Sequence, residues 1–165
     1  MQADRKFEQI LLEHGAMIRR IASSHEAKPH LAEELVQEIY LAVWKALPAY
    51  RNQATLRTFL ARIATNRAVT HVARSMRTPR SVELDESLPA PDVGPEGAAL
   101  AHDRRNALLA AMRSLPLALR QPAMLAAEGL APAEISDVLG ISVNAVAIRM
   151  SRARDALRKV LPEGI

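Results

Sequence analysis

The sequence predicts an all-α protein of two small helical domains joined by a flexible linker, with a helix-turn-helix in the C-terminal domain. Aromatic residues make up only 3% of the 165-residue chain, whereas alanine and leucine are plentiful, and this composition favours helices over sheets. No sustained period-two run and no Asn-Gly or Asp-Gly hairpin turn occurs. A proline-rich stretch near the middle of the chain interrupts the helical periodicity and divides the chain into two parts.

The N-terminal domain, residues 1–77, begins with two amphipathic helical patterns. The first spans about residues 4–24, and its inward-facing residues are Phe7, Ile10, Leu11, Met17, Ile18 and Ile21. The second spans about residues 31–47 and ends before a proline, and its apolar stripe consists of Leu35, Ile39, Val43 and Leu47. Between the two helices, His25 and His30 flank a Lys-Pro turn, a position that favours exposure to solvent.

A third helical pattern begins after Thr55, a predicted N-cap, and runs to about Arg77. Its early apolar stripe consists of Leu56, Leu60 and Ile63. Farther along, the same angular register holds Arg67, Thr70 and Arg74. Two interpretations remain open: the helix leaves the core and meets an anionic partner, or its packing face rotates onto Ala68 and Val72.

Residues 78–97 are predicted to form the linker. They include four prolines, and they hold five acidic residues against one arginine. Such a segment buries too little apolar surface to offset the entropy lost on ordering, so we expect it to be mobile. Residues 1–77 carry a net charge of +5, residues 78–100 carry −4 and residues 101–165 carry +3. Two basic blocks joined by an acidic segment suit binding to phosphate backbones.

The C-terminal domain, residues 98–165, is expected to begin with a helix over about 99–115 that ends at Pro116. The apolar residues of this helix are Leu108, Leu109, Met112 and Leu115. A second helix is expected near residues 120–128. Pro122 would lie in its first turn, where a missing backbone N–H costs little.

The remainder of this domain, residues 129–158, has the pattern of a helix-turn-helix. A short helix over Pro132–Leu139 is followed by Gly140, which suits the positive φ of a tight turn, and a second helix begins after Ser142. Ala131 precedes the first helix without a capping oxygen, which costs about 1 kcal/mol. The second helix has one apolar side, and its other residues include Arg149, Arg152, Arg154, Arg158 and Lys159. Such a helix can enter a major groove, although a basic solvated face on an ordinary bundle is the alternative.

The residue inventory argues against catalysis and metal binding. The chain has no cysteine, which excludes disulfides, zinc–cysteine sites and thiol nucleophiles. Its five histidines lack a paired metal spacing, and no nucleophile elbow or phosphate-binding glycine loop occurs. We therefore expect no enzyme activity, no metal and no cofactor. The N-terminus is unlike a signal peptide and no apolar run approaches a membrane span, which predicts a cytoplasmic protein with no membrane insertion.

Two long motifs occur in order along the chain. Residues 33–74 read EELVQEIYLAVWKALPAYRNQATLRTFLARIATNRAVTHVAR, and residues 114–158 contain SLP followed by GLAPAEISDVLGISVNAVAIRMSRARDALR. These motifs resemble regions 2 and 4 of the extracytoplasmic-function (ECF) group of bacterial RNA polymerase sigma factors. The resemblance implies that the protein binds core RNA polymerase and promoter DNA, both duplex and single-stranded, and helps to open the duplex. It also implies that an anti-sigma protein holds the free factor.

The resemblance assigns candidate residues in region 2. The residues that would grip the polymerase are Leu35, Gln37, Glu38, Leu41 and Trp44, although Trp44 is equally compatible with a place in the core. The residues that would read the minus-ten promoter element are Tyr50, Arg51, Asn52, Arg57, Arg62, Asn66, Arg67 and Arg74. Polar loop side chains can bond a base edge, Tyr50 can stack on a base, and arginines suit phosphates. A plain solvated loop is the alternative for the first three.

In region 4 the resemblance assigns the minus-thirty-five element to Ser142, Asn144, Ala145, Ile148, Arg149, Arg152 and Arg154. The sequence departs from the family here, since the usual Thr-Val-Arg-Ser-Arg is replaced by Ala145-Val146-Ala147-Ile148-Arg149. Alanine and isoleucine can touch a thymine methyl group but cannot read guanine. Ile148 is alternatively a contact to another protein.

Two other functions compete with that of a sigma factor. A stand-alone helix-turn-helix regulator would explain residues 129–158 but would leave residues 33–74 unexplained. A sigma-like decoy would bind an anti-sigma protein and contact no DNA, which fits the apolar side chains of Ala145, Ala147 and Ile148.

Overall fold

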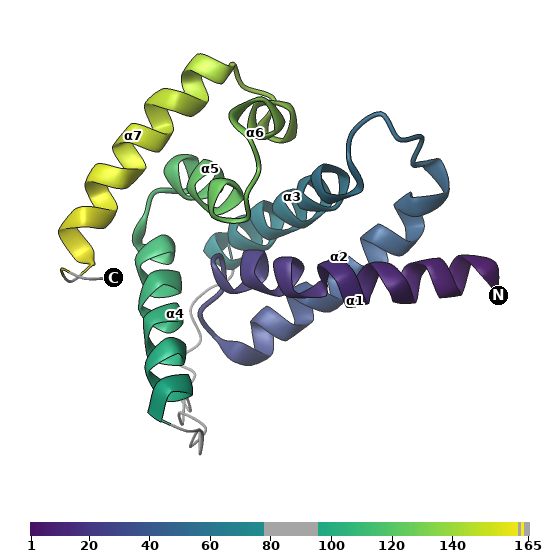
Figure 1. The fold of residues 1–165 in the computed structure, drawn as a ribbon, viewed down its shortest axis with the longest axis horizontal. Coiled ribbons are helices and arrows are strands. Elements are labelled where there is room, and N and C mark those ends of the chain that lie inside the picture. Colours follow the sequence, from purple (N-terminus) through teal and green to yellow (C-terminus); the bar gives the residue numbers. More distant parts are fainter. Residues whose placement is uncertain (78–95, 162, 164–165) are drawn as a thin grey trace.

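The computed structural model describes residues 1–77, 96–161 and 163, and every regular element in these ranges is helical, which confirms the all-α prediction (Figure 1). The N-terminal half, residues 1–77, contains α1 (Gln2–Ser23), α2 (Pro29–Ala46), the 3-10 turn η1 (Leu47–Ala49) and α3 (Leu56–Arg77). The C-terminal half, residues 96–161, contains α4 (Glu96–Ser114), α5 (Leu117–Ala127), α6 (Pro132–Leu139) and α7 (Val143–Val160). The predicted linker lies outside the described residues, except for its last two residues, which begin α4.

The three long helices of the N-terminal half pack around an apolar core. Its largest members, each no more than 1% exposed, are Ile18, Ile21, Leu35, Ile39, Val43 and Leu60. These positions recur every three to four residues, so each helix buries one stripe, as the sequence predicts. Leu11 departs from the predicted stripe because it is only partly buried. The predicted N-cap is confirmed, since the Thr58 backbone N–H donates to Thr55 Oγ1 at 3.2 Å.

The packing face of α3 rotates toward its C-terminal end. Ala64 and Ala68 are fully buried, whereas Arg67 and Arg74 are exposed. Alanines at the contact let neighbouring helices approach closely, so α3 remains on the core beyond its first turns. Of the two interpretations that the sequence leaves open, the rotation onto Ala68 is the one observed.

The start of α5 differs from the prediction. The expected start near residue 120 is wrong, because α5 begins at Leu117 with Pro116 as its N-cap. Pro122 therefore lies inside the helix rather than in its first turn. Its ring is fully buried, and this packing offsets the backbone hydrogen bond that an interior proline removes.

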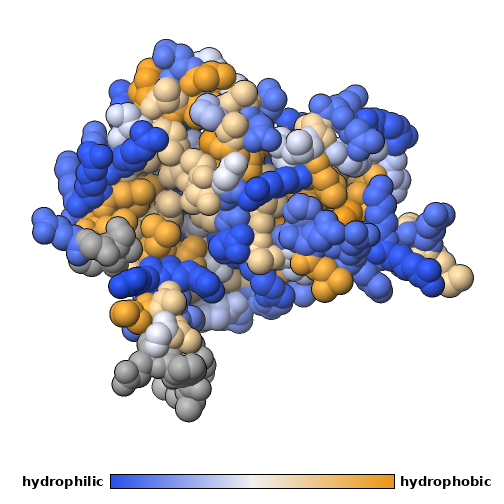
Figure 2. All heavy atoms as spheres, viewed as in Figure 1, coloured by the Kyte–Doolittle hydropathy of each residue, from blue (hydrophilic) through white to orange (hydrophobic). Residues whose placement is uncertain are grey.

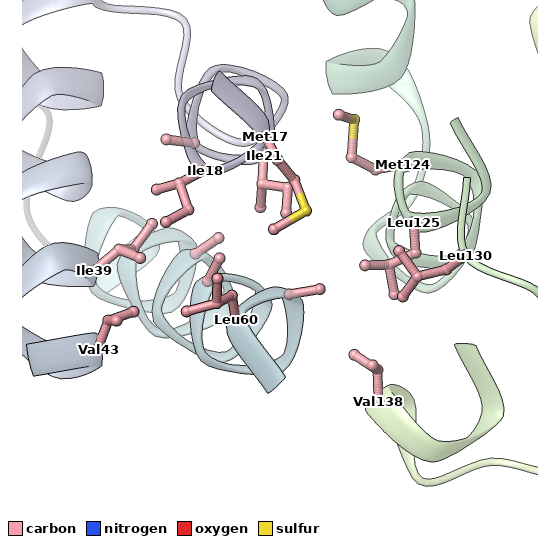
Figure 3. Packing of buried hydrophobic residues seen from close by; sticks show 14 of the residues in the cluster. Met17, Ile18, Ile21, Ile39, Val43, Leu60, Met124, Leu125, Leu130 and Val138 are labelled. Carbon is pink, nitrogen blue, oxygen red and sulfur yellow. The ribbon is translucent and has the colours of Figure 1, made fainter. Parts of the chain in front are cut away.

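The two halves share one hydrophobic core (Figure 3). The shared cluster joins Met17, Ile21 and Leu60 of the N-terminal half to Met124, Leu125, Leu130 and Val138 of the C-terminal half. A second and smaller cluster belongs to the C-terminal half alone and contains Met112, Leu115, Ala123 and Ala153. In Figure 3 the side chains of α1 and α3 face those of α5 and α6 across the boundary. The C-terminal half therefore buries apolar surface against the N-terminal half as well as within itself.

The expectation that His25 lies at the surface is wrong. His25 is only 7% exposed, because the chain turns inward after α1 before α2 begins. Its Nδ1 atom lies 2.9 Å from both the Ile21 carbonyl oxygen and Ser24 Oγ. Burial, together with the nearby charges of Arg120 and His71, lowers the pKa of His25 to about 4. His30 is exposed, as expected.

Candidate nucleic-acid interface

The helix-turn-helix predicted from the sequence is formed by α6 and α7 (Figure 1). Gly140 ends α6 in the left-handed conformation with φ of 66°, so a residue with a side chain would be strained there. Ser142 caps α7, since the Ala145 backbone N–H donates to Ser142 Oγ at 3.0 Å. Ala131 lacks a capping oxygen, as predicted, but its backbone N–H donates to Glu134 Oε2 at 2.7 Å. Half of a capping box thus fixes the start of α6.

The outer face of α7 combines apolar and cationic side chains. Val146 and Ala153 are buried, which turns Asn144, Ile148 and Arg152 toward solvent. Figure 2 shows apolar residues near the N-terminal end of α7, at the top, and hydrophilic residues over its C-terminal half, at the left. Ala145 is partly buried. Arg152 and Arg154 are exposed and Arg149 is partly buried. Within the described part of the chain, no acidic side chain pairs with any of the three, so they can accept phosphates.

A second exposed surface lies on α2. Leu41 is 53% exposed and Trp44 is 49% exposed, so neither belongs to the core. Gln37 is exposed beside them, and Glu38 forms an ion pair with Arg74 at 3.3 Å. Leu35, which the resemblance assigns to this surface, is instead fully buried, because it lies one turn before Ile39 on the core stripe of α2.

The loop that follows η1 is held by its own side chains. The Tyr50 hydroxyl donates to the Ala54 carbonyl oxygen at 2.6 Å, and the Tyr50 ring centroid lies 4.7 Å from that of Phe59. Arg51 Nη1 donates to the Pro48 carbonyl oxygen at 2.6 Å. Asn52 adopts a positive φ of 57° and is exposed at the tip of the loop. Tyr50 therefore supports the shape of the loop, while the exposed polar residues that follow it face solvent.

The basic residues of α3 fall into two groups. Arg57 Nη2 donates to the Glu128 carbonyl oxygen, and Arg62 Nη2 donates to the Asp137 carbonyl oxygen at 3.1 Å. Two of the predicted minus-ten residues thus donate to the C-terminal half, while their side chains remain exposed. Asn66 and Arg67 lie farther along α3 and are exposed to solvent.

Glu128, which the sequence analysis missed, connects the two halves. Its carboxylate is 4% exposed and accepts hydrogen bonds from Arg20 Nε at 2.6 Å and Arg20 Nη2 at 2.8 Å. This bidentate contact raises the pKa of Arg20. Glu128 follows the last residue of α5, where the helix dipole disfavours an acid. That unfavourable position is the one signal in the sequence that could have identified Glu128.

Two further titratable side chains, His71 and Arg113, form polar contacts within the fold. His71 Nε2 lies 2.7 Å from Glu26 Oε2, and both side chains are 13% exposed. Arg113 Nη1 donates to the Ser23 carbonyl oxygen at 2.8 Å, and burial lowers the pKa of Arg113.

Among residues 1–77 and 96–161, no group of three or more His, Asp or Glu side chains could hold a metal ion. The same residues contain no helix with the length and apolar character needed to cross a membrane.

Comparison with protein families matches each half of the chain to a conserved region of one family. Sigma-70 region 2 matches residues 10–78, and Sigma-70, region 4, matches residues 105–157. The ECF RNA polymerase sigma factor SigE of Mycolicibacterium smegmatis is 33% identical over 161 residues, which cover 94% of this chain and 61% of SigE. SigG of Mycobacterium tuberculosis is 34% identical over 157 residues, which cover 81% of this chain and 42% of SigG. The chain thus spans less than two thirds of the length of these two relatives.

Two solved structures have a similar fold. CnrH, determined in complex with the cytosolic domain of CnrY, is 26% identical, with a TM-score of 0.69 over 96% of this chain and 91% of CnrH. RpoE of Bartonella quintana, determined with the anti-sigma factor NepR, is 22% identical, with a TM-score of 0.73 over 98% of this chain and 99% of that chain, and it supports the fold alone.

The ECF RNA polymerase sigma-E factor of Escherichia coli K12 is 30% identical over 140 residues, which cover 78% of this chain and 73% of that protein. With both sigma regions present in order, the chain belongs to the ECF family of RNA polymerase sigma factors.

Proposed function

We propose that the protein is a sigma factor that binds core RNA polymerase and directs it to promoter DNA. It acts as an adaptor rather than an enzyme, and it works in the cytoplasm, where the polymerase transcribes. One observation carries this proposal: a single chain with both sigma regions in order has an exposed apolar face on α2 and a cationic outer face on α7. A stand-alone regulator would need only the α7 face, and a decoy would need only the α2 face.

Leu41 and Trp44 form the centre of the proposed polymerase contact. They lie one turn apart on α2 and are about half exposed, and a clustered Leu and Trp provide the apolar anchor that stable protein interfaces use. The double substitution Leu41→Ala/Trp44→Ala should lower the affinity for core polymerase by about 100-fold, measured by fluorescence anisotropy. Leu12→Ala is the matched control, because Leu12 is 87% exposed on α1 and lies outside the proposed contact. An unchanged affinity of the double variant would contradict this assignment.

The minus-ten surface is proposed to combine the loop tip with the outer face of α3. Arg51 and Asn52 are presented by the loop that Tyr50 holds in shape. Asn66 can pair with an adenine edge, and Arg67 can contact phosphate. We propose that the two predicted domains, residues 1–77 and 98–165, act on DNA as separate units, so that each reaches its own promoter element.

The minus-thirty-five surface is proposed to read thymine methyl groups. Ile148 is 45% exposed on the outer face of α7, Ala147 is exposed beside it, and the arginines that could read guanine lie farther along the helix. Replacing thymine with deoxyuridine removes only the methyl group. This replacement at a contacted position should weaken duplex binding by about fourfold for the wild-type chain and have little effect on Ile148→Ala. Equal sensitivity of the two chains to the replacement would rule out this readout.

A transcription assay with purified core polymerase tests the whole proposal. The expected result is a promoter-dependent transcript that appears only when the chain and the polymerase are both present. Duplex DNA binding without any effect on transcription would favour the stand-alone regulator. Binding to neither DNA nor polymerase would favour the decoy.

We also propose that an anti-sigma protein holds the free factor. A cleft of about 390 Å³ lies between the halves and is lined by Arg19 and Glu33 on one side and by Asn106, Leu109 and Arg113 on the other. Such a cleft offers both charged and apolar contacts to a helix from a partner. The 26%-identical CnrH was determined in complex with the cytosolic domain of CnrY, and this complex supports a protein partner for the chain.

A further inference from the structure

The loop between η1 and α3, residues 50–55, is fixed at both of its ends. At its start, the Tyr50 backbone N–H donates to the Leu47 carbonyl oxygen at 3.1 Å. At its end, Thr55 Oγ1 caps α3 by accepting from the Thr58 backbone N–H at 3.2 Å. Compact surface loops that are held by their own side chains are frequently functional.

The side chain of Tyr50 closes this loop across its middle. Its hydroxyl donates to the Ala54 carbonyl oxygen at 2.6 Å, so the hydroxyl hydrogen is already used within the protein. Its ring packs against α3, where the ring centroid of Phe59 lies 4.7 Å away and the two ring planes are inclined by 35°. Tyr50 is partly buried as a result. Both ends of the side chain therefore hold the loop against α3.

Asn52 lies at the tip of the loop in a strained backbone conformation. Its φ is 57°, and it is the one residue other than glycine with a positive φ in the described part of the chain. An L-residue pays about 1 kcal/mol or more for this left-handed conformation, whereas glycine adopts it freely. Such strain persists only where the surrounding structure imposes it, and here the Tyr50 contacts do so. What asparagine adds at this position is an exposed side-chain amide.

The Asn52 amide suits an unstacked base. An amide offers a hydrogen-bond donor and an acceptor side by side, so it can form two hydrogen bonds with one base edge. A base that leaves the stack exposes its edges to a polar loop of this kind. Fixing the amide before the base arrives reduces the conformational entropy that is lost on binding.

We propose that Tyr50 is a positioning residue that holds Asn52 in the left-handed conformation, so that the Asn52 amide reads one unstacked base of the minus-ten strand. Tyr50 acts on this base through Asn52 and does not stack on it. The inference rests on the proposed function, which assigns this loop to single-stranded promoter DNA. The hold of Tyr50 on the loop can be tested without DNA.

The first experiment measures the backbone order of residues 51–54 in the free chain by ¹⁵N relaxation. The wild-type amides should have order parameters above about 0.8, which is typical of rigid backbone. Tyr50→Phe removes only the hydroxyl and should lower these values below about 0.6. Tyr40→Phe is the matched control, because it removes the same atom from the other tyrosine of the chain, which is also partly buried but lies on α2. A mobile wild-type loop, or an equally rigid loop in Tyr50→Phe, would overturn the proposal.

The second experiment measures base preference in the holoenzyme. The probes are fluorescent single strands from the minus-ten region of a promoter that the wild-type holoenzyme transcribes, with each of the four bases placed in turn at every position. The wild-type holoenzyme should prefer one base by at least about tenfold at one position. Asn52→Gly should reduce that preference to about twofold or less and leave the other positions unchanged. Tyr50→Phe should reduce the same preference by at least about threefold, and Tyr40→Phe should retain it.

The variants separate positioning from stacking and from folding. Tyr50→Phe keeps the aromatic ring, so a full base preference in this variant would fit stacking and would overturn the positioning role. Asn52→Gly should change the melting temperature little, because relief of backbone strain offsets the entropy that glycine loses on folding. A preference that survives Asn52→Gly would refute the assignment of the amide. Failure of the wild-type holoenzyme to transcribe would refute the proposed function and with it the base assignment, whereas the relaxation data would still decide whether Tyr50 holds the loop.

Discussion

The two halves of the molecule bury apolar surface in different ways. The N-terminal half fills its core with large aliphatic side chains from three long helices of its own. The cluster that belongs to the C-terminal half alone contains two large residues, Met112 and Leu115, and two alanines. Other large buried residues of the C-terminal half, including Leu125 and Ile135, lie in the cluster shared with the N-terminal half, whereas Leu108, Leu119 and Leu157 pack, partly buried, against the smaller cluster. It is therefore the half whose stability should depend on its neighbour.

This difference matters for how each half would respond to a loss of the contact between them. A half with its own core can remain folded after separation, whereas a half that completes its core at the boundary loses stability when the boundary opens. The apolar residues that such a loss would expose to solvent are those of α5 and α6 in the shared cluster.

The largest expected effects come from truncating one core residue in each half. Ile39→Ala and Ile135→Ala remove side chains that are at most 1% exposed, and each should lower the free energy of unfolding by about 3 kcal/mol. Hydrogen exchange should separate the two variants. Ile39→Ala should speed exchange in both halves, while Ile135→Ala should speed it in α5, α6 and α7 and leave α1 and α2 protected. Equal loss of protection in α1 and α2 would mean that the halves unfold as one unit.

The next effect is a loss of folding stability at acid pH, caused by His25 in the N-terminal half. The pKa of His25 is about 4 in the folded chain and 6.5 as a free group, so between these pH values the unfolded chain binds more protons than the folded chain. Stability is therefore full above pH 6.5 and falls as the pH drops to 4, by about 3 kcal/mol in total. Urea denaturation at pH 7 and pH 4.5 measures the loss. His25→Gln should lose less stability than the wild-type chain over this interval, whereas the exposed-site control His30→Gln should match the wild-type loss.

A smaller effect tests how far the stability of the C-terminal half depends on the turn between α6 and α7. Gly140 has φ of 66° and nothing within 4 Å of an added Cβ, so Gly140→Ala should cost about 1–2 kcal/mol through backbone strain alone. Gly97→Ala also meets no neighbour but lies in a helix with no positive φ, so it should be neutral or stabilising. Thermal denaturation of the two variants makes the comparison. A neutral Gly140→Ala would show that the turn can relax without moving α7.

The smallest effect concerns the start of α7. Ser142→Ala removes the oxygen that accepts from the Ala145 backbone N–H, and it should cost about 1 kcal/mol. Ser151→Ala is a control on the same helix, because Ser151 is exposed and lies in the helix interior, where alanine is preferred. If both substitutions leave the melting temperature unchanged, the cap at Ser142 contributes nothing to the stability of the C-terminal half.

Much of the local structure could be predicted because it follows from local chemistry. The period of Ile18, Ile21, Leu35 and Ile39 predicts which faces of α1 and α2 are buried, and Gly140 and Ser142 predict the turn and the start of α7. The start of α5 could not be predicted, because the turn preference of Pro122 is overridden by the burial of its ring. The burial of His25 was missed for a similar reason, since neighbouring residues in the sequence did not reveal which helices would cover it.

The residues of the candidate surfaces could likewise be predicted only in part from the sequence. The sequence pattern identified Trp44, Asn66, Ile148 and Arg152 as exposed candidates, but it also included Leu35, whose place on the core stripe removes it from the surface. Glu128 and Arg20 lie 108 positions apart in the chain, and the sequence contains no signal that would pair them.

The sequence by itself determined the helices, the helix-turn-helix, the charge distribution and the family, because these depend on residue type and on spacing within a few turns. Only the tertiary structure decided which of the exposed arginines of the N-terminal half donate to the C-terminal half and which face solvent alone. The physical reason is that Arg57 and Arg62 carry the same charge as Arg67 and Arg152. What distinguishes them is the position of two carbonyl oxygens from the other half, which depends on how the shared core packs.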